Sequence, residues 1–466
     1  MRSWPSPDLP DLPPVPGVLQ IYDTARQTIV PVGPDDPHRV ARMYVCGITP
    51  YDATHIGHAF TYLTFDLVNR VWRDLGLSVQ YAQNVTDIDD PLLERANQVG
   101  VAWPELAAEE IERFRADMTA LRILPPDHFV PVTDSIPTIT AALDRLRATG
   151  AIYPVNDPWL DWYFDNSALP LDQISHLPLN DRLALFAERG GDPERAAKRH
   201  PLDALVWRAA REGEPSWPSS LGPGRPGWHI ECVVIADHTL GLPIDLQGGG
   251  ADLIFPHHEM SAAQALIHRL LASRAAPDRC DGKATTSKAG WTPVERCQRR
   301  QRAYLGLRSS DESVDQGESC GLANQPLARA YLHSAMVWFE GAKMSKSLGN
   351  LVKVAALLQA GADPMAVRLA LLAQHYRTDW TWSGLGAATA RLNRWRQAYA
   401  GQTAIDFAPT AAQVRAALRD DLRADQALLA IDAWAEACLT RAQDHPGARA
   451  EMAKVADGLL GVAVVT

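Results

Sequence analysis

The sequence predicts an α/β fold, a Rossmann-like parallel sheet followed by a C-terminal helical bundle. Between residues 42 and 85 the chain passes from an apolar strand through a loop and an amphipathic helix to a second strand, which is how a parallel sheet begins. From Val354 onward the pattern is helical and rich in alanine and leucine. Ligands bind beyond the carboxyl ends of such strands, so a site is expected at that edge.

Residues 1–38 form the first segment and are rich in proline, which predicts an extended arm on the surface. The segment has neither the basic start nor the apolar centre of a signal peptide. No later stretch is long and apolar enough to cross a bilayer. A cytoplasmic protein is therefore expected, with no membrane partner.

Residues 39–150 are predicted to form the first half of the catalytic sheet. Arg42–Cys46 and Leu77–Val85 have the composition of strands, and His58–Leu75 has apolar residues at helical spacing. Residues 91–150 are expected to be mostly helical. Residues 151–225 are mixed and rich in proline and glycine, which predicts a connective insertion between the two halves of the sheet.

Residues 226–353 are predicted to form the second half of the sheet, with a strand at Ile244–Gln247, and residues 354–466 the helical bundle. Within this half, residues 271–325 show little apolar periodicity and predict a flexible insertion. It is either a surface loop or the product of an aberrant reading of the gene. It carries three cysteines that lack the paired spacing of a metal site, namely Cys280, Cys297 and Cys320.

The composition is that of an ordinary globular protein with 466 residues and a net charge of −10. An acidic chain favours polyanions only where its basic residues cluster. From Val352 onward there are 12 basic and 11 acidic residues, so the tail offers no basic stripe for tRNA. The six cysteines are too sparse for a disulfide framework, so a functional cysteine is expected to be a ligand or a nucleophile.

Two short motifs suit the binding of a nucleotide triphosphate. His55-Ile56-Gly57-His58 lies in a loop that opens a helix, where oriented N–H groups attract phosphate. Lys343-Met344-Ser345-Lys346-Ser347 offers two lysines that can stabilise the departing pyrophosphate. Each motif alone could be a chance tetrapeptide or a solvated basic turn. Together, in this order, they resemble the paired signature of class I aminoacyl-tRNA synthetases.

Longer blocks resemble cysteinyl-tRNA synthetases within that class. The blocks are Tyr44–Asp52, Asn84–Asp90, Gly222–Cys232 and Gly249–Glu259. An isolated buried cysteine is usually a small core residue, but in that family the matching Cys, Cys and His bind zinc. The resemblance therefore implies one Zn²⁺ on Cys46, Cys232 and His257. A zinc-bound thiolate separates cysteine from serine, which a pocket selecting by size does poorly.

The same resemblance implies roles for further residues. ATP, with Mg²⁺, is the expected nucleotide, and its phosphates would be stabilised by His55, His58, Lys343 and Lys346. The positions that hold the adenylate in the family match Cys46, Gly47, Ile48, Thr49, Thr61, Asn84, Val85, Thr86, Trp228, Gly250, Ala251, Asp252 and Val337.

Two departures favour a sister family, the mycothiol cysteine ligases. Cysteinyl-tRNA synthetases have a fourth ligand, a Glu four residues after the zinc-binding His, where this chain has Ser261. Glu259, two residues after His257, is expected to point elsewhere. The helical tail is also short for an anticodon-reading domain. The sequences of Glu188–Pro193 and Met260–Ala263 resemble those of the ligases, and so does almost the whole chain except residues 271–325.

The resemblance implies ATP-dependent ligation of L-cysteine to the amine of 1D-myo-inosityl 2-amino-2-deoxy-α-D-glucopyranoside through cysteinyl-AMP. The expected partners are small molecules without nucleic acid, and the chain is expected to be a monomer. A cysteinyl-tRNA synthetase is the nearest alternative. A non-catalytic paralogue that only binds cysteine or zinc is the second, and the two intact motifs weigh against it because binding alone does not need both.

Overall fold

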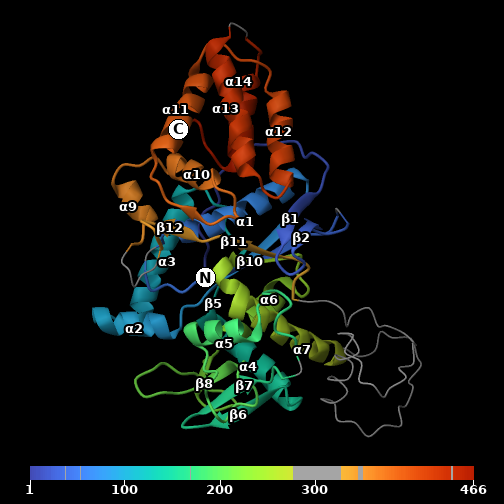
Figure 1. Cartoon of the computed structure of the whole chain (residues 1–466), viewed down its shortest axis with the longest axis vertical. Helices are drawn as coiled ribbons and strands as arrows, with labels where there is room; N and C mark the ends of the chain where they lie inside the picture. Colours follow the sequence, from blue (N-terminus) through green and yellow to red (C-terminus); the bar gives the residue numbers. More distant parts are fainter. Residues whose placement is uncertain are drawn as a thin grey trace, which may run out of the picture. The chain divides into compact units, whose positions relative to one another are not determined.

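The computed structural model describes residues 1–36, 38–52, 54–167, 169–275, 327–344, 350–441 and 444–465 (Figure 1). The chain divides into two compact units. The first comprises Met1–Pro131, Asp245–Leu253 and Ala330–Thr466, and the second comprises Val132–Ile244 and Ile254–Arg329. Most of the predicted insertion, with its three cysteines, lies outside the described residues, but its first five residues still belong to a helix.

A five-stranded sheet is the centre of the first unit, and all its neighbouring strands are parallel, which confirms the predicted fold class. The strand order is β11-β10-β3-β4-β5. From β3 the chain first adds β4 and β5 on one side of the sheet and later adds β10 and β11 on the other side. The order in which the strands are connected therefore reverses between β3 and β10. Ligands bind at such a switch point. The strands are β3 (Ala41–Ile48), β4 (Val79–Val85), β5 (His128–Pro131), β10 (Leu246–Gly250) and β11 (Tyr331–Ser334).

Helices and two small sheets complete the first unit. An antiparallel hairpin joins β1 (Leu19–Asp23) to β2 (Thr28–Val32), and a three-stranded sheet contains β12 (Val337–Phe339), β13 (Ala342–Lys343) and β14 (Trp380–Thr381). The helices that lie between β3 and β5 in the chain are α1 (Ile56–Asp74), α2 (Asp90–Val99) and α3 (Trp103–Ala120). Those of the C-terminal part are α9 (Val354–Gln359), α10 (Pro364–Leu372), α11 (Gly386–Ala400), α12 (Ala408–Arg419), α13 (Ala424–Thr440) and α14 (Ala448–Leu460). The last four pack side by side, which confirms the predicted helical tail (Figure 1).

The second unit is built around an antiparallel sheet of four strands, in the order β6-β7-β8-β9. The strands are β6 (Ile152–Asn156), β7 (Leu160–Phe164), β8 (Ala204–Ala209) and β9 (Gly224–Pro226). Its helices are α4 (Val132–Ala148), α5 (Leu179–Glu188), α6 (Trp228–Leu240) and α7 (Glu259–Ala275). Among the described residues, no helix has both the length and the apolar character needed to span a bilayer.

A buried ion cluster joins α1 to the C-terminal helices of the first unit. The carboxylate of Asp66 on α1 accepts from Arg70 Nε at 2.8 Å and from Arg368 of α10, and all three side chains are fully buried. The remaining guanidinium donors bind backbone carbonyls at the ends of α3 and α14, those of Arg122, Asp457, Leu121 and Leu460. A buried charge costs little only when it is paired and hydrogen-bonded in this way.

We predict that Arg368→Leu lowers the free energy of unfolding by about 3–5 kcal/mol, because it leaves the Asp66 carboxylate buried with one partner removed. Denaturant unfolding measures the change. The matched control is Arg396→Leu, whose ion pair with Asp363 is 2.6 Å long but has both side chains about one-third exposed. That loss is expected to stay within about 1 kcal/mol. Equal losses in the two variants would show that the buried cluster has no special weight.

Candidate functional site

The carboxyl ends of β3 and β4 bring several predicted residues together in the first unit. The side-chain oxygen of Asn84 accepts from the backbone N–H of Gly47 at 2.8 Å and from the Tyr44 hydroxyl at 3.0 Å. Its amide nitrogen donates to Thr86 Oγ1 at 3.1 Å. The pairing of β3 with β4 shifts register between Val45 and Ile48, so the chain bulges there.

Gly47 is required by space at this bulge. A Cβ at this position would lie 1.5 Å from the backbone oxygen of Asn84, a distance that no side chain can tolerate. We predicted that the strand ends at Cys46, whereas β3 continues through Gly47 to Ile48. The close approach of the two strands explains the glycine. Ile48 and Val85 turn their side chains into the hydrophobic core, so only their backbone is available to a ligand.

The His-Ile-Gly-His motif opens α1. His55 is the N-cap, and its ring Nδ1 accepts from the backbone N–H of Gly57 at 3.1 Å. The ring stacks on His58 at 3.9 Å between centroids. The first turn of α1 has no acidic residue, so nothing there offsets the positive end of the helix dipole. Two half-buried imidazoles and a helix N-terminus together form an anion-binding surface.

Gly57 also has a local reason to be glycine. A Cβ there would lie 2.8 Å from the ring of His55, so the missing side chain makes room for that imidazole. The glycine thus helps to fix the first histidine of the motif.

Other predicted residues of the first unit gather around the same helix start. The Thr61 hydroxyl lies 2.7 Å from Ser334 Oγ at the end of β11 and donates to the carbonyl of Gly57 at 3.2 Å. A Cβ on Gly250, at the end of β10, would lie 4.0 Å from Thr61 Oγ1. A Cβ on Gly57 would lie at the same distance from the side chain of Val337. Ala251 and Asp252 follow in a short 3₁₀ turn, and the carboxyl end of the sheet is therefore where these residues meet.

The Lys-Met-Ser-Lys-Ser motif is described only at its start. Lys343 belongs to β13, which pairs with Trp338 of β12. Lys346 lies outside the described residues, as do the two serines.

The remaining predicted residues belong to the second unit, on α6 and before α7. Trp228 is the first residue of α6, with 38% of its surface exposed, and Cys232 is buried one turn later. His257 is buried and lies in the turn before α7. Its Nδ1 lies 3.0 Å from Nδ1 of His229. Burial, and then the neighbouring His257, lowers the pKa of His229 well below its ordinary value, so His229 is neutral.

As expected, the carboxylate of Glu259 is held by backbone hydrogen bonds and is not placed as a metal ligand. Its buried carboxylate accepts the backbone N–H groups of Gln173, Ile174 and Ser175 at 2.9–3.0 Å. Burial raises its pKa, although these bonds act in the opposite direction. Ser261 is fully buried, and its hydroxyl donates weakly to the carbonyl of His229 at 3.4 Å.

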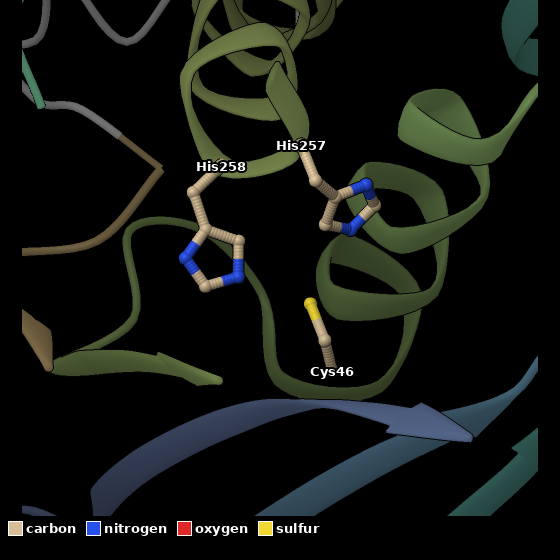
Figure 2. Close-up of side chains that lie close together, drawn as sticks. All are labelled: Cys46, His257 and His258. Carbon is tan, nitrogen blue, oxygen red and sulfur yellow. The ribbon is translucent and has the colours of Figure 1, made fainter. Parts of the chain in front are cut away.

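Both units contain buried side chains with atoms that can bind a metal. Figure 2 draws Cys46, His257 and His258, which are all buried. Cys46 belongs to β3 in the first unit, and His257 and His258 precede α7 in the second (Figure 2). Cysteine sulfur and imidazole nitrogen are the donors that zinc prefers. Sequence reasoning did not single out His258 or His229, although both stand beside predicted ligands in the Phe255–Glu259 and Gly227–Cys232 blocks.

The family described as "tRNA synthetases class I (C) catalytic domain" matches residues 34–270 and 312–389. The L-cysteine:1D-myo-inositol 2-amino-2-deoxy-alpha-D-glucopyranoside ligase of Thermomonospora curvata is 51% identical over 473 residues, covering 100% of both chains. The ligase of the same name from Thermobifida fusca is 50% identical over 470 residues and covers 100% of this chain and 99% of its own.

Solved structures share the fold. Methionyl-tRNA synthetase of Mycobacterium tuberculosis, bound by methionyl-adenylate, has a TM-score of 0.57 and 16% identity, and the match covers 91% of this chain and 93% of that one. LeuRS of Agrobacterium radiobacter K84 in its ternary complex has a TM-score of 0.59 and 11% identity, covering 95% and 85%. At these identities the likeness shows the fold alone.

We predict that Gly47→Ala destabilises the protein by at least about 3 kcal/mol, because the new methyl group overlaps the Asn84 carbonyl and the strands must separate. Thermal unfolding monitored by circular dichroism measures this. The control is Gly386→Ala at the start of α11, where an added Cβ meets nothing within 4 Å. The control is expected to be neutral or slightly stabilising. A near-native melting temperature for Gly47→Ala would contradict the close packing of β3 on β4.

Proposed function

The chain belongs to the family of L-cysteine:1D-myo-inositol 2-amino-2-deoxy-alpha-D-glucopyranoside ligases, and we propose that it joins L-cysteine to that amino-sugar. The observation that carries the proposal is identity of about one half to these ligases along the whole of both chains. The reaction consumes ATP and releases AMP and pyrophosphate. It forms one amide bond, which joins cysteine to the amino-sugar.

In the first step, an oxygen of the cysteine carboxylate attacks the α-phosphorus of ATP, and the bond to pyrophosphate breaks. The two imidazoles at the start of α1, His55 and His58, are proposed to bind the phosphates, with Lys343 and Lys346 meeting the charge that builds on the leaving group. ATP is proposed to enter with Mg²⁺. The backbone of Gly47 and Ile48, with Thr49, Asn84 and Thr86, would line the adenylate, as would Thr61, Trp228, Gly250, Ala251, Asp252 and Val337.

In the second step, the neutral amine of the sugar attacks the adenylate carbonyl. The carbon–oxygen bond to AMP breaks, and the carboxylate oxygen leaves with the phosphate. Holding both reactants in one pocket converts a bimolecular reaction into an effectively unimolecular one, which supplies much of the rate.

Zinc fits the donor set proposed for it, namely Cys46, Cys232 and His257. His257 Nδ1 faces His229, so its Nε2 is the nitrogen suited to a metal, in the arrangement by which a neighbouring acceptor orients a metal-binding imidazole. When bound, zinc would hold the substrate thiolate and so select cysteine over serine. Ser261 has no carboxylate to compete with that thiolate for the metal.

A cysteinyl-tRNA synthetase is the alternative, and it is not favoured. The full-length relatives bear the ligase name, and the C-terminal part from Val352 onward, with 12 basic and 11 acidic residues, has an excess of only one positive charge. We propose accordingly that the protein works on small molecules in the cytoplasm as a monomer, without nucleic acid.

The acceptor is tested by supplying the purified protein with ATP, labelled cysteine and either the glucosaminyl-inositol or cysteine-specific tRNA. We expect labelled amide on the amino-sugar and no charged tRNA. A matched reaction with glucosamine alone reports how much the inositol contributes. Efficient charging of tRNA would overturn the acceptor while leaving cysteine activation in place.

The ligand set is tested by metal analysis of purified variants. Cys232→Ser is expected to lose zinc and cysteine activation together, because a hydroxyl is a poor ligand beside a thiolate. The control is His258→Gln, which removes the imidazole next to His257. This variant is expected to keep its zinc. If His258→Gln loses the metal and Cys232→Ser retains it, His258 takes the place of Cys232 among the ligands.

A further inference from the structure

The turn that carries His257 is bonded on both sides by groups that come from elsewhere in the second unit. The turn spans Ile254–His258 and leads into α7. Phe255, two residues before His257, has an extended backbone with φ −134° and ψ 136°, so the helical pattern is interrupted there. Because regular helical hydrogen bonds do not by themselves fix such a backbone, its other partners decide how precisely His257 is placed.

The first of these partners is the side chain of Arg189. Its guanidinium Nη1 donates to the backbone carbonyl of Phe255. Phe255 is only 1% exposed, so this hydrogen bond meets little competition from water. A charged donor forms a stronger hydrogen bond than a neutral one, and its loss would take a partner from a buried acceptor. Arg189 therefore holds the turn at a point two residues before His257.

Arg189 belongs to Glu188–Pro193, the block whose sequence resembles the ligases. It is the C-cap of α5, and the chain then turns at Gly190, whose φ of +85° favours glycine. The N–H of Gly191 donates to the carbonyl of Phe186 at 2.8 Å. A Cβ on Gly191 would lie 2.5 Å from the Phe186 ring. The two glycines thus end α5 at the residue whose side chain reaches the turn before α7.

Packing keeps this block and the turn together. Phe186 of α5 and Phe255 of the turn lie in one buried apolar cluster, which also contains Met260 of α7. At the other end of the block, Asp192 accepts from the hydroxyl of Tyr163 on β7. The block is therefore attached both to the sheet of the second unit and to the segment that carries His257.

The second partner acts on the other side of His257. The carboxylate of Glu259, which is 2% exposed, accepts the three consecutive N–H groups of residues 173–175. Arg189 and Glu259 thus make their bonds two residues before and two residues after His257. The contact of His257 Nδ1 with His229 orients the ring between them. Backbone and imidazole are both held before any metal binds.

We propose that Arg189 is a positioning residue for the zinc-binding imidazole of His257, and that the Glu188–Pro193 block serves the metal site through it. The inference rests on the proposed function, since it assumes that His257 is a zinc ligand. Arg189 would touch neither the metal nor a substrate. Partners that orient a metal ligand typically contribute about 10–100-fold to metal affinity. Because Arg189 bonds the backbone near the ligand and not its ring, the lower end of that range is expected.

The test is zinc affinity, measured on the full chain by competition with a chelating dye after the metal has been removed. Arg189→Met keeps most of the aliphatic stem and removes the donors, and it should weaken zinc binding by about tenfold. Arg189→Lys, which keeps a charged donor, should recover most of that loss. The matched control is Arg199→Met, because Arg199 is 54% exposed and pairs with Asp165 at 3.0 Å. The control should keep the native affinity.

A second measurement needs no metal and separates positioning from a merely structural role. In the zinc-free protein, amide hydrogen exchange in residues 254–260 should be several-fold faster in Arg189→Met than in the native chain, with β6, β7 and the melting temperature little changed. Native zinc affinity in Arg189→Met, or an equal loss in Arg199→Met, overturns the inference. A native protein that binds no zinc would instead overturn the proposed metal site, and the inference with it.

Discussion

The buried carboxylate of Asp66 is the interaction on which the first unit depends. It stands in the middle of α1, the helix whose first turn carries His55 and His58. Burial by itself would raise its pKa, but the charges of Arg368 and Arg70 hold that pKa below its ordinary value. The two arginines then bind the last carbonyls of neighbouring helices. One anion thus fixes α1 against the C-terminal helices.

Because Asp66 fixes the middle of α1, the N-terminus of this helix is held in a defined position. At that end, the β-ladder of His55 with Lys353 fixes the backbone just before the first turn. On the sheet side, Asn84 ties the bulge at Gly47 to Thr86. Rigid elements therefore hold the phosphate-binding groups, and preorganised donors of this kind stabilise charge without reorganising during the reaction.

Much of this arrangement was predictable from sequence, because local patterns carry it. Apolar periodicity predicted a helix that begins at His58, two residues after the observed start of α1 at Ile56. His55 is the N-cap of this helix. Parallel strands followed from the strand, helix, strand order. The motif residues of the first unit lie at the carboxyl edge because strands in a parallel sheet all end there.

Other features depend on contacts between distant residues, which no local pattern contains. Asp66 and Arg368 are 302 positions apart, and His55 pairs with Lys353 from a distant part of the chain. The four-residue strand β5 was missed inside a segment expected to be helical, because a strand so short leaves little alternation to detect. The antiparallel sheet of the second unit was hidden in the same way by its proline-rich loops.

The central claim is that cysteine is activated as an adenylate and then passed to an amine. It is tested most directly by running the complete reaction with cysteine labelled with oxygen-18 in both carboxylate positions, and analysing the AMP by mass spectrometry. Attack of the carboxylate on the α-phosphorus predicts one labelled oxygen in each AMP formed, and one left in the amide. Unlabelled AMP, with the label found in inorganic phosphate or retained on cysteine, would contradict the account.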